Sequence, residues 1–212
     1  RVILHSKEIE RLNTQNTADL LEKRAGINVQ KSQMGGGSPN IRGFEANRIL
    51  LILDGVRLNN AIYRSGHLQN IITIDESILE DVEIIFGPSS VLYGSDALGG
   101  TINMKTQSLY FRAQPAWSGN MFLNYNSAYQ GGKTNASFLF ESKNYSTITN
   151  FSFKRFGDLK MGGYRPHGYD EWGLVYHYIN DVDSIVCNPS PEIQKGSAYH
   201  QYDFFNKMIF KI

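Results

Sequence analysis

The sequence predicts an α+β domain over residues 1–107, followed over residues 108–212 by antiparallel transmembrane strands of a β-barrel. Aromatic residues are the first observation: four lie in residues 1–107, whereas the other 22 of the 2 Trp, 12 Tyr and 12 Phe lie in residues 108–212. The second is that apolar and polar residues alternate with a period of two only in the second half. Two different solvents therefore surround the two halves.

The N-terminal half has the signals of a compact domain. Thr17 is placed to cap a short helix with apolar residues at helical spacing, which the glycine at position 26 ends. The apolar run 49–53 predicts a strand buried on both faces, and Asp54-Gly55 predicts a tight turn after it. Asp75 is placed to cap a second short helix. Further strands are predicted at 27–29, 82–86 and 101–106, a loop at 34–39 and a helical turn at 89–93.

Four alternating runs follow, each about ten residues long, which is the length of a tilted membrane-spanning strand. They begin near Trp117, Asn135, Asn150 and Tyr202, and aromatic residues lie near several of their ends, as a membrane interface favours. A soluble sheet with one buried face would show the same alternation. The connections favour the membrane, because the tight segment 143–146 would face the periplasm and the long segment 157–199 would lie outside the cell.

Four strands are too few to close a barrel. An open edge facing lipid would leave backbone groups without hydrogen-bond partners. We therefore expect the 212 residues to be the N-terminal part of a longer protein.

The composition argues against several function classes. With 21 basic and 20 acidic side chains, there is no electrostatic case for a nucleic-acid partner. A single cysteine, Cys187, excludes an internal disulfide and a cysteine-type metal cluster. The glycine-rich runs lack the Gly-Lys-Ser/Thr ending of a phosphate loop, and residues 87–90 do not form a nucleophile elbow. We therefore predict no enzyme, no catalytic residue, and neither a resident metal nor an intrinsic cofactor.

Six short motifs follow one another between residues 17 and 103, and together they resemble the plug of TonB-dependent receptors. They are TADLL at 17–21, IRGF at 41–44, LDGVR at 53–57, EDVEI at 80–84, GPSSVLYG at 87–94 and ALGGTIN at 97–103. The resemblance implies a plug inside the lumen of a 22-stranded barrel, in the cell outer membrane of a Gram-negative bacterium. It also implies that TonB and its inner-membrane complex pull on an N-terminal TonB box. No such box is recognisable before Ile9, so we expect it outside this sequence.

The resemblance implies ligand-gated, TonB-energised uptake of a scarce nutrient. Its expected partners are TonB, outer-membrane lipid, the transported small molecule and a surface lipoprotein. Because segment 59–70 resembles the haem and haemoglobin branch, also seen in iron-complex receptors, haem or a ferric complex is the predicted cargo. Vitamin B12, siderophores and oligosaccharides remain open. The alternative function is an outer-membrane adhesin or a passive channel that kept a plug. Energy-dependent uptake would distinguish the receptor from both.

The family places a loop such as 59–70 at the apex of the plug, facing the ligand. The predicted ligand-binding residues of the apical loops are Glu45, Tyr63, Arg64, His67 and Gln69. Imidazole is a common ligand of haem iron, which makes His67 a candidate axial ligand, and a surface histidine without a ligand is the alternative. His167, in the long outer segment, is a weaker candidate for a ligand contact from the outer side.

Arg42 is predicted to latch the plug to barrel glutamates, because a guanidinium fork matches carboxylates. Receptors of this family commonly carry a second arginine before the Gly-Pro-Ser motif, and here that position is Phe86. The second pair is therefore predicted to be missing, which would loosen the closed gate. The carboxylates at positions 75, 76, 80, 81 and 83 are predicted to cap and solvate a helix and the strand that follows it.

Overall fold

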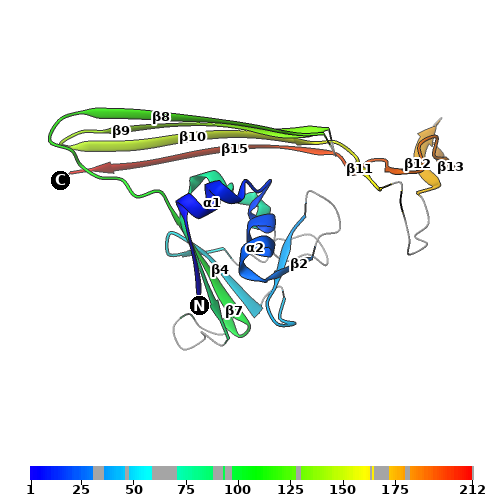
Figure 1. The fold of residues 1–212 in the computed structure, drawn as a ribbon, viewed down its shortest axis with the longest axis horizontal. Helices are drawn as coiled ribbons and strands as arrows, with labels where there is room; N and C mark the ends of the chain where they lie inside the picture. Colours follow the sequence, from blue (N-terminus) through cyan, green and yellow to red (C-terminus); the bar gives the residue numbers. More distant parts are fainter. Residues whose placement is uncertain are drawn as a thin grey trace.

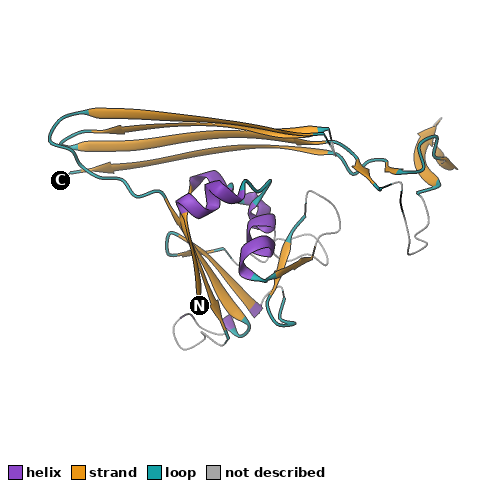
Figure 2. Cartoon of the chain, viewed as in Figure 1, coloured by secondary structure: helices purple, strands orange, loops and turns teal. Residues whose placement is uncertain are grey.

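The structure, a computed structural model, describes residues 1–30, 36–45, 48–58, 71–87, 93, 97–127, 130–162, 164, 172–179 and 182–211. An N-terminal α+β domain lies beneath a long four-stranded sheet (Figure 1). The helices of this domain lie between its own sheet and the long sheet (Figure 2). The helical side of the domain therefore meets one face of the long sheet.

The N-terminal domain is built on a five-stranded sheet in the order β1-β6-β7-β4-β5. Strands β4 and β7 are parallel, and the other neighbours pair antiparallel. Its strands are β1 (Val2–His5), β4 (Ile49–Leu53), β5 (Val56–Arg57), β6 (Leu79–Phe86) and β7 (Gly100–Thr106). Every residue of β4 except Leu53 is buried, which confirms the strand expected from the unbroken apolar run. Asp54 and Gly55 have φ angles of 47° and 85°, as a tight hairpin turn requires.

Short helices and a small hairpin complete the domain: α1 (Ser6–Leu12), α2 (Thr17–Ala25), η2 (Ile71–Thr73), η3 (Glu76–Ile78), β2 (Asn28–Gln30) and β3 (Ser38–Asn40). The expected cap of α2 was wrong by one residue, since the Asn16 side chain accepts from the Asp19 amide. The Thr17 hydroxyl donates instead to the Ile74 carbonyl. Gly26 ends α2 in the left-handed conformation, as predicted, and Asp75 caps η3.

The end of the predicted loop at 34–39 is instead strand β3, in which Pro39 pairs with Val29. Proline is tolerated there because the hairpin stands apart as a two-stranded sheet and is not a central strand. The predicted helical turn at 89–93 lies outside the described residues except for Tyr93. The larger of two apolar clusters, which includes Leu4, Ile9 and Leu20, joins the helices to the five-stranded sheet.

The long sheet is antiparallel, in the order β15-β10-β9-β8. Its strands are β8 (Ala116–Asn126), β9 (Gly131–Glu141), β10 (Tyr145–Phe156) and β15 (Tyr199–Phe210), each of 11 or 12 residues. They contain the four alternating runs that the sequence predicts, although Ile212 at the end of the last run lies outside the described residues. The tight connection between β9 and β10 closes with a hydrogen bond from the Ser142 amide to the Tyr145 carbonyl.

The two faces of the long sheet differ in chemistry. Exposed apolar side chains cover the face turned away from the N-terminal domain: Trp117, Met121, Leu123, Tyr125, Phe138, Phe151, Tyr202, Phe204, Met208 and Phe210. The opposite face carries buried polar residues such as Lys133, Asn135, Asn150, Ser152 and Lys154. This alternation is the pattern of strands in an incomplete β-barrel, with an apolar outer face and a polar lumen.

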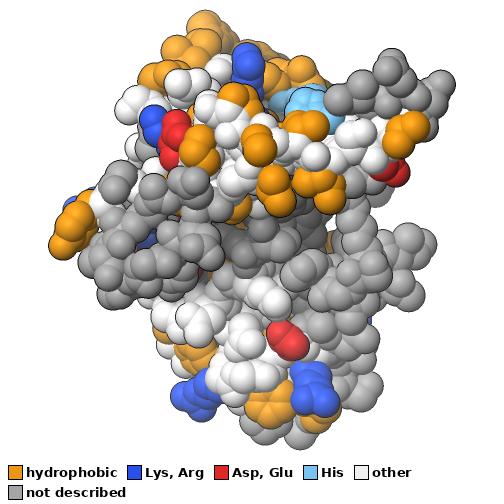
Figure 3. Space-filling view, turned by 90° about the vertical axis from the view of Figure 1, so that its right-hand side faces the viewer, with side chains coloured by type: hydrophobic (Ala, Val, Ile, Leu, Met, Phe, Trp, Pro, Cys, Tyr) orange, Lys and Arg blue, Asp and Glu red, His pale blue; other side chains and the backbone are white. Residues whose placement is uncertain are grey.

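The segment predicted as one long connection also contains strands. A hairpin of β12 (Leu174–Ile179) and β13 (Val182–Cys187) and the short pair β11 (Leu159–Lys160) and β14 (Ile193–Gln194) extend beyond the end of the sheet. Viewed from that end, hydrophobic side chains gather in the upper half of the molecule (Figure 3). Among the described residues, no helix is long and apolar enough to cross a membrane.

Candidate functional site

The N-terminal domain contacts the polar face of the long sheet through the residues that begin η3. The apolar residues Ile71, Ile72 and Ile74 anchor the preceding chain in the core. Asp75 then caps η3 by accepting from the Ser77 amide at 2.7 Å. This local geometry directs the acidic pair Asp75 and Glu76 at the long sheet.

Two lysines of the long sheet meet these two carboxylates in a buried four-charge cluster. Lys133 Nζ, from β9, lies 3.1 Å from Asp75 and 2.7 Å from Glu76. Lys154 Nζ, from β10, lies 3.0 Å from each of them. The side chains of Lys154, Asp75, Glu76 and Lys133 are 0%, 1%, 6% and 7% exposed. The cluster is therefore almost fully buried, and its formal charges cancel.

Uncharged side chains extend the hydrogen-bond network around the cluster. Ser152 Oγ donates to Asp75 Oδ2 at 2.5 Å. Asn135 Nδ2 donates to Ser77 Oγ and to Asn150 Oδ1, each at 2.9 Å. Buried ion pairs are stable only when such bonds offset the loss of water, and this network supplies them.

Electrostatics keeps the Asp75 carboxyl ionised. Burial by itself raises the pKa of Asp75, but the positive charges of Lys154 and Lys133 lower it, assisted by hydrogen bonds from Ser152 and Ser77. The net effect is a pKa well below the ordinary value of 3.8. The cluster therefore remains paired at neutral and mildly acidic pH.

A second, more exposed contact lies where β7 ends. Lys207 Nζ, from β15, donates to Thr106 Oγ1 at 3.0 Å and lies 3.4 Å from Asp54. Gln201 on the same strand donates to the Ile72 carbonyl at 3.0 Å. Burial raises the pKa of Asp54, but hydrogen bonds from Thr106 and the charge of Lys207 bring it below its usual value. Strands β9, β10 and β15 therefore all bond to the N-terminal domain.

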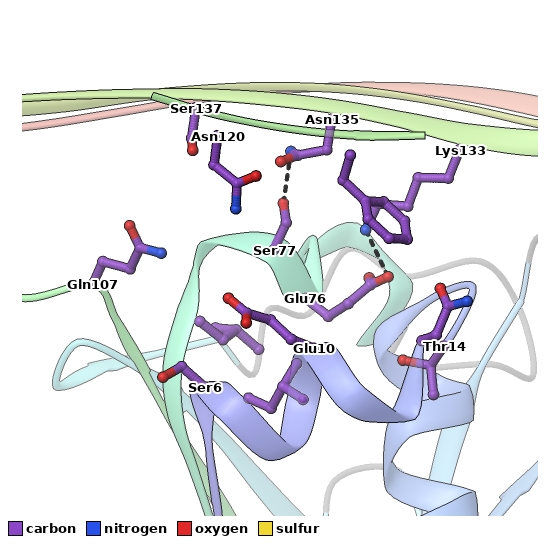
Figure 4. Close-up of a pocket in the computed structure, with 14 residues that line it drawn as sticks. Ser6, Glu10, Thr14, Glu76, Ser77, Gln107, Asn120, Lys133, Asn135 and Ser137 are labelled. Atoms are coloured by element: carbon purple, nitrogen blue, oxygen red, sulfur yellow. Dashed lines mark hydrogen bonds and ion pairs between the residues drawn. The ribbon is translucent and has the colours of Figure 1, made fainter. Parts of the chain in front are cut away.

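A cavity of about 200 Å³ lies beside the four-charge cluster, between α1, η3 and strands β8 and β9. Figure 4 shows polar side chains on both sides of it, with Ser6, Glu10 and Thr14 from the domain and Asn120 and Ser137 from the sheet. Within the described ranges, no group of three or more His, Cys, Asp or Glu residues could hold a metal ion.

The residues predicted from the apical loops are only partly within the described structure. Tyr63, Arg64, His67 and Gln69 lie outside the described residues, and so does His167. Glu45 is described and exposed. The structure therefore leaves the predicted ligand-binding group as a prediction.

Arg42 is exposed in a turn, with a φ of 52°. Its guanidinium lies 5.6 Å from the centre of the Phe86 ring. Arg42 therefore neighbours the residue that stands where the family commonly has a second arginine. An exposed cation–π contact of this kind contributes about 0.5–1 kcal/mol. The predicted pair with barrel glutamates is not tested by this contact and remains a prediction.

The acidic residues at 75 and 76 correct the expectation from sequence. They were expected to cap and solvate a helix. Asp75 does cap η3, but both carboxylates are buried against Lys133 and Lys154 instead of being solvated. One signal could have indicated the pair: Lys154 lies on the polar face of a predicted membrane strand, where a charge needs a partner, whereas Lys133 lies in the segment predicted to connect two strands. Periodicity cannot say which residue is that partner, because the carboxylates belong to another domain.

Comparison with known proteins assigns the N-terminal domain. Residues 1–101 match the model of the TonB-dependent Receptor Plug Domain family. Over 108 residues, 50% of this chain, the sequence is 41% identical to the vitamin B12 transporter BtuB of Vibrio vulnificus strain CMCP6, covering 17% of that protein. Over 204 residues, 88% of this chain, it is 31% identical to the vitamin B12 transporter BtuB of Vibrio vulnificus strain YJ016, covering 31% of that protein.

Among solved structures, the FrpB iron transporter from Neisseria meningitidis (F3-3 variant) has a similar fold. The TM-score is 0.73 at 15% sequence identity, and the match covers 97% of this chain and 28% of the other. The chain spans less than a third of the length of these three proteins. The plug-domain match and the relatives agree with a structure in which a plug lies on the polar face of an amphipathic sheet. The chain belongs to the family of TonB-dependent outer-membrane receptors.

Proposed function

We propose that this chain forms the plug and the first wall strands of a receptor that imports a scarce nutrient across the outer membrane of a Gram-negative bacterium. Import is gated by the ligand from outside and powered through TonB. The buried cluster of Lys133 and Lys154 with Asp75 and Glu76 carries the proposal, because it seals a plug against the lumen side of a wall. The exposed apolar face of the same strands suits contact with lipid.

For the ligand, we propose a corrinoid of the vitamin B12 type as the first candidate. Identity of 31% over 88% of the chain to a vitamin B12 transporter supports it, and that match includes both plug and wall. Haem or another ferric complex is the second candidate, supported by the sequence of segment 59–70 with Tyr63, Arg64 and His67. In either case the metal complex is cargo and not a resident cofactor.

An uptake experiment tests this function. The full-length gene is expressed in a Gram-negative host that lacks its own vitamin B12 and haem receptors, with and without TonB. Growth on limiting cyanocobalamin that requires both the gene and TonB would support the first ligand, and the same result with haem as the iron source would support the second. Uptake without TonB would favour the passive channel, and uptake of neither compound would reject both ligands.

A matched pair of histidine variants separates the ligand roles. If haem is carried, we expect His67→Ala to reduce haem uptake, since imidazole is a common iron ligand. The control is His177→Ala, which changes an exposed histidine of β12. Equal uptake by the two variants would remove His67 from the binding site. TonB and a surface lipoprotein are proposed partners that rest on the same import function.

A further inference from the structure

The apolar face of the long sheet, which is turned away from the N-terminal domain, carries a single group of basic side chains. Because strand residues alternate between the two faces, every second residue of β8, β9, β10 and β15 lies on this face. Of these residues, only Arg155 on β10 and His200 on β15 can carry a positive charge, and none has a carboxylate. Both side chains are exposed. The outward surface of the wall therefore has one basic position and is otherwise uncharged.

Arg155 and His200 lie directly opposite each other across β10 and β15. Side chains in such a pair are close neighbours, with Cβ atoms about 5 Å apart. Within the described ranges of the chain, neither side chain has an ion-pair partner. When His200 is protonated the two groups repel each other, and a bound anion would offset that repulsion. The pair therefore has the charge and the spacing of an anion site.

A groove of about 390 Å³ opens beside the basic pair. Its lining includes two stacked aromatic pairs, Phe153 with Tyr202 and Phe156 with Tyr199. Their ring centres are 4.8 Å and 4.7 Å apart. His200 in turn meets the edge of the Tyr202 ring, with ring centres 5.8 Å apart. These ring contacts restrain one another, so the groove presents apolar rings at fixed positions next to the basic groups.

The basic pair lies at the level of the outer headgroups. Tyr145 begins β10 beside the tight connection that we expect in the periplasm, and Arg155 follows ten residues later. Ten residues of a strand tilted by about 40° rise roughly 25 Å across the membrane, which is the height of the apolar band of an outer-membrane barrel. Beyond this end of the sheet extend the short strands of the segment expected outside the cell (Figure 1).

The chemistry of the pair matches a phosphate among the groups found at that level. A guanidinium presents two parallel N–H donors that fit a phosphate, and its apolar stem can lie along an apolar surface. The imidazole of His200 adds a further donor. Closer to the middle of the membrane, Phe151 and Phe204 are opposite each other and exposed, and they offer a surface for acyl chains.

We propose that Arg155 and His200 bind a phosphate group of a lipid in the outer leaflet, whose acyl chains lie along the aromatic side chains next to them. Arg155 supplies the permanent charge and the paired donors, and His200 adds a donor from the neighbouring strand. The bound lipid bridges β10 and β15 on the side of the wall opposite the plug. Because the site is on the outside of the wall, it does not depend on which nutrient the receptor carries.

Lipid titration of the full-length receptor tests this site. The purified receptor in detergent is titrated with lipid A that carries both of its phosphates, and the bound lipid is counted by native mass spectrometry. We expect Arg155→Gln to weaken binding at least tenfold, because it keeps a polar side chain but removes the charge and the donor fork. The matched control, Lys143→Gln, removes an exposed cation at the opposite end of the same sheet and should bind within twofold of wild type.

The same titration tests the requirement for phosphate and for the fork. Lipid A without phosphates should bind wild type at least tenfold more weakly, and Arg155→Lys should bind the phosphorylated lipid with an affinity between those of wild type and Arg155→Gln. Equal binding of the two lipids, or equal binding by Arg155→Gln and the control, would overturn the proposal. Displacement of the lipid by an equal concentration of inorganic phosphate would also overturn it, since the site would then take free phosphate.

A thermal measurement separates loss of the site from loss of the fold. Phosphorylated lipid A should raise the unfolding temperature of wild type and of Lys143→Gln, but not that of Arg155→Gln, because only a bound lipid stabilises the folded state. An equal rise in all three would assign the effect to the apolar face alone and contradict the proposal. If Arg155→Gln unfolds early without lipid, His200→Gln replaces it: binding reduced at least threefold is expected, and unchanged binding would overturn the proposal.

Discussion

Replacing Lys154 by methionine tests the charge cluster directly. The change keeps the length and apolar stem of the side chain but removes the cation that lies 3.0 Å from both Asp75 and Glu76. Lys133 then faces two carboxylates alone. Because the cluster is almost fully buried, water cannot replace the missing charge without opening the interface.

The expected loss of docking free energy follows from this burial. Removing one partner of a buried pair costs about 3–5 kcal/mol, and the lower end applies here because Lys133 remains. A loss of about 3 kcal/mol raises the population of undocked plug roughly 100-fold, since each 1.4 kcal/mol is a factor of ten. Adding Glu76→Gln removes the surplus charge, so we expect the double variant to recover part of this loss.

Limited proteolysis of the full-length receptor in detergent measures the undocked population. Cleavage of the plug follows the equilibrium fraction that is open when opening and closing are fast. The matched control is Lys207→Met, a lysine of the same sheet face whose side chain is 31% exposed and whose ion pair with Asp54 spans 3.4 Å. An exposed pair contributes at most about 1 kcal/mol, so cleavage of the control should rise by about fivefold or less.

The comparison between the two lysine variants tests whether the buried cluster is the main attachment of the plug. Equal cleavage rates for Lys154→Met and Lys207→Met would refute the reasoning that burial makes the cluster the main attachment. A Lys154→Met plug that is as resistant as wild type, with normal amounts in the outer membrane, would mean that other contacts hold the plug.

Three further predictions concern pH, the gate and the ligand. Because docking lowers the pKa of Asp75 below its ordinary value of 3.8, the ionised carboxylate stabilises the docked plug above that pH, and this stabilisation is lost as the pH falls below it. Protease resistance should therefore be constant from pH 8 to 5 and decrease only below about pH 4. If Arg42 pairs with the wall, the Arg42→Ala receptor should let more vancomycin enter cells. An increase no larger than that of Phe86→Leu would mean that Arg42 acts only through its contact with the Phe86 ring. If the ligand is haem, binding to the wild-type receptor should shift the Soret band of haem, and a shift unaltered in His67→Ala would exclude that residue as the iron ligand.

Local patterns in the sequence predicted most of the architecture. Alternation along each wall strand is a property of residues two apart, so it identified both faces of β8, β9, β10 and β15 without reference to the plug. The unbroken apolar run of β4 and the glycine after α2 are equally local signals. The cap of α2 was misplaced because Asn16 and Thr17 are both good capping residues, and the Thr17 hydroxyl found a partner in Ile74.

The attachment of plug to wall was decided by the tertiary structure alone. Lys154 and Glu76 are 78 residues apart, and the sequence places Lys154 on the polar face of its strand without identifying its partner. Their pairing depends on how the docked plug turns η3 towards β9 and β10, which is a property of packing and not of any local period. By itself, the sequence determined which residues face the lumen and which face outwards. Only the docking of the two units determined which lumen-facing charges lose water, and therefore which of them hold the plug closed.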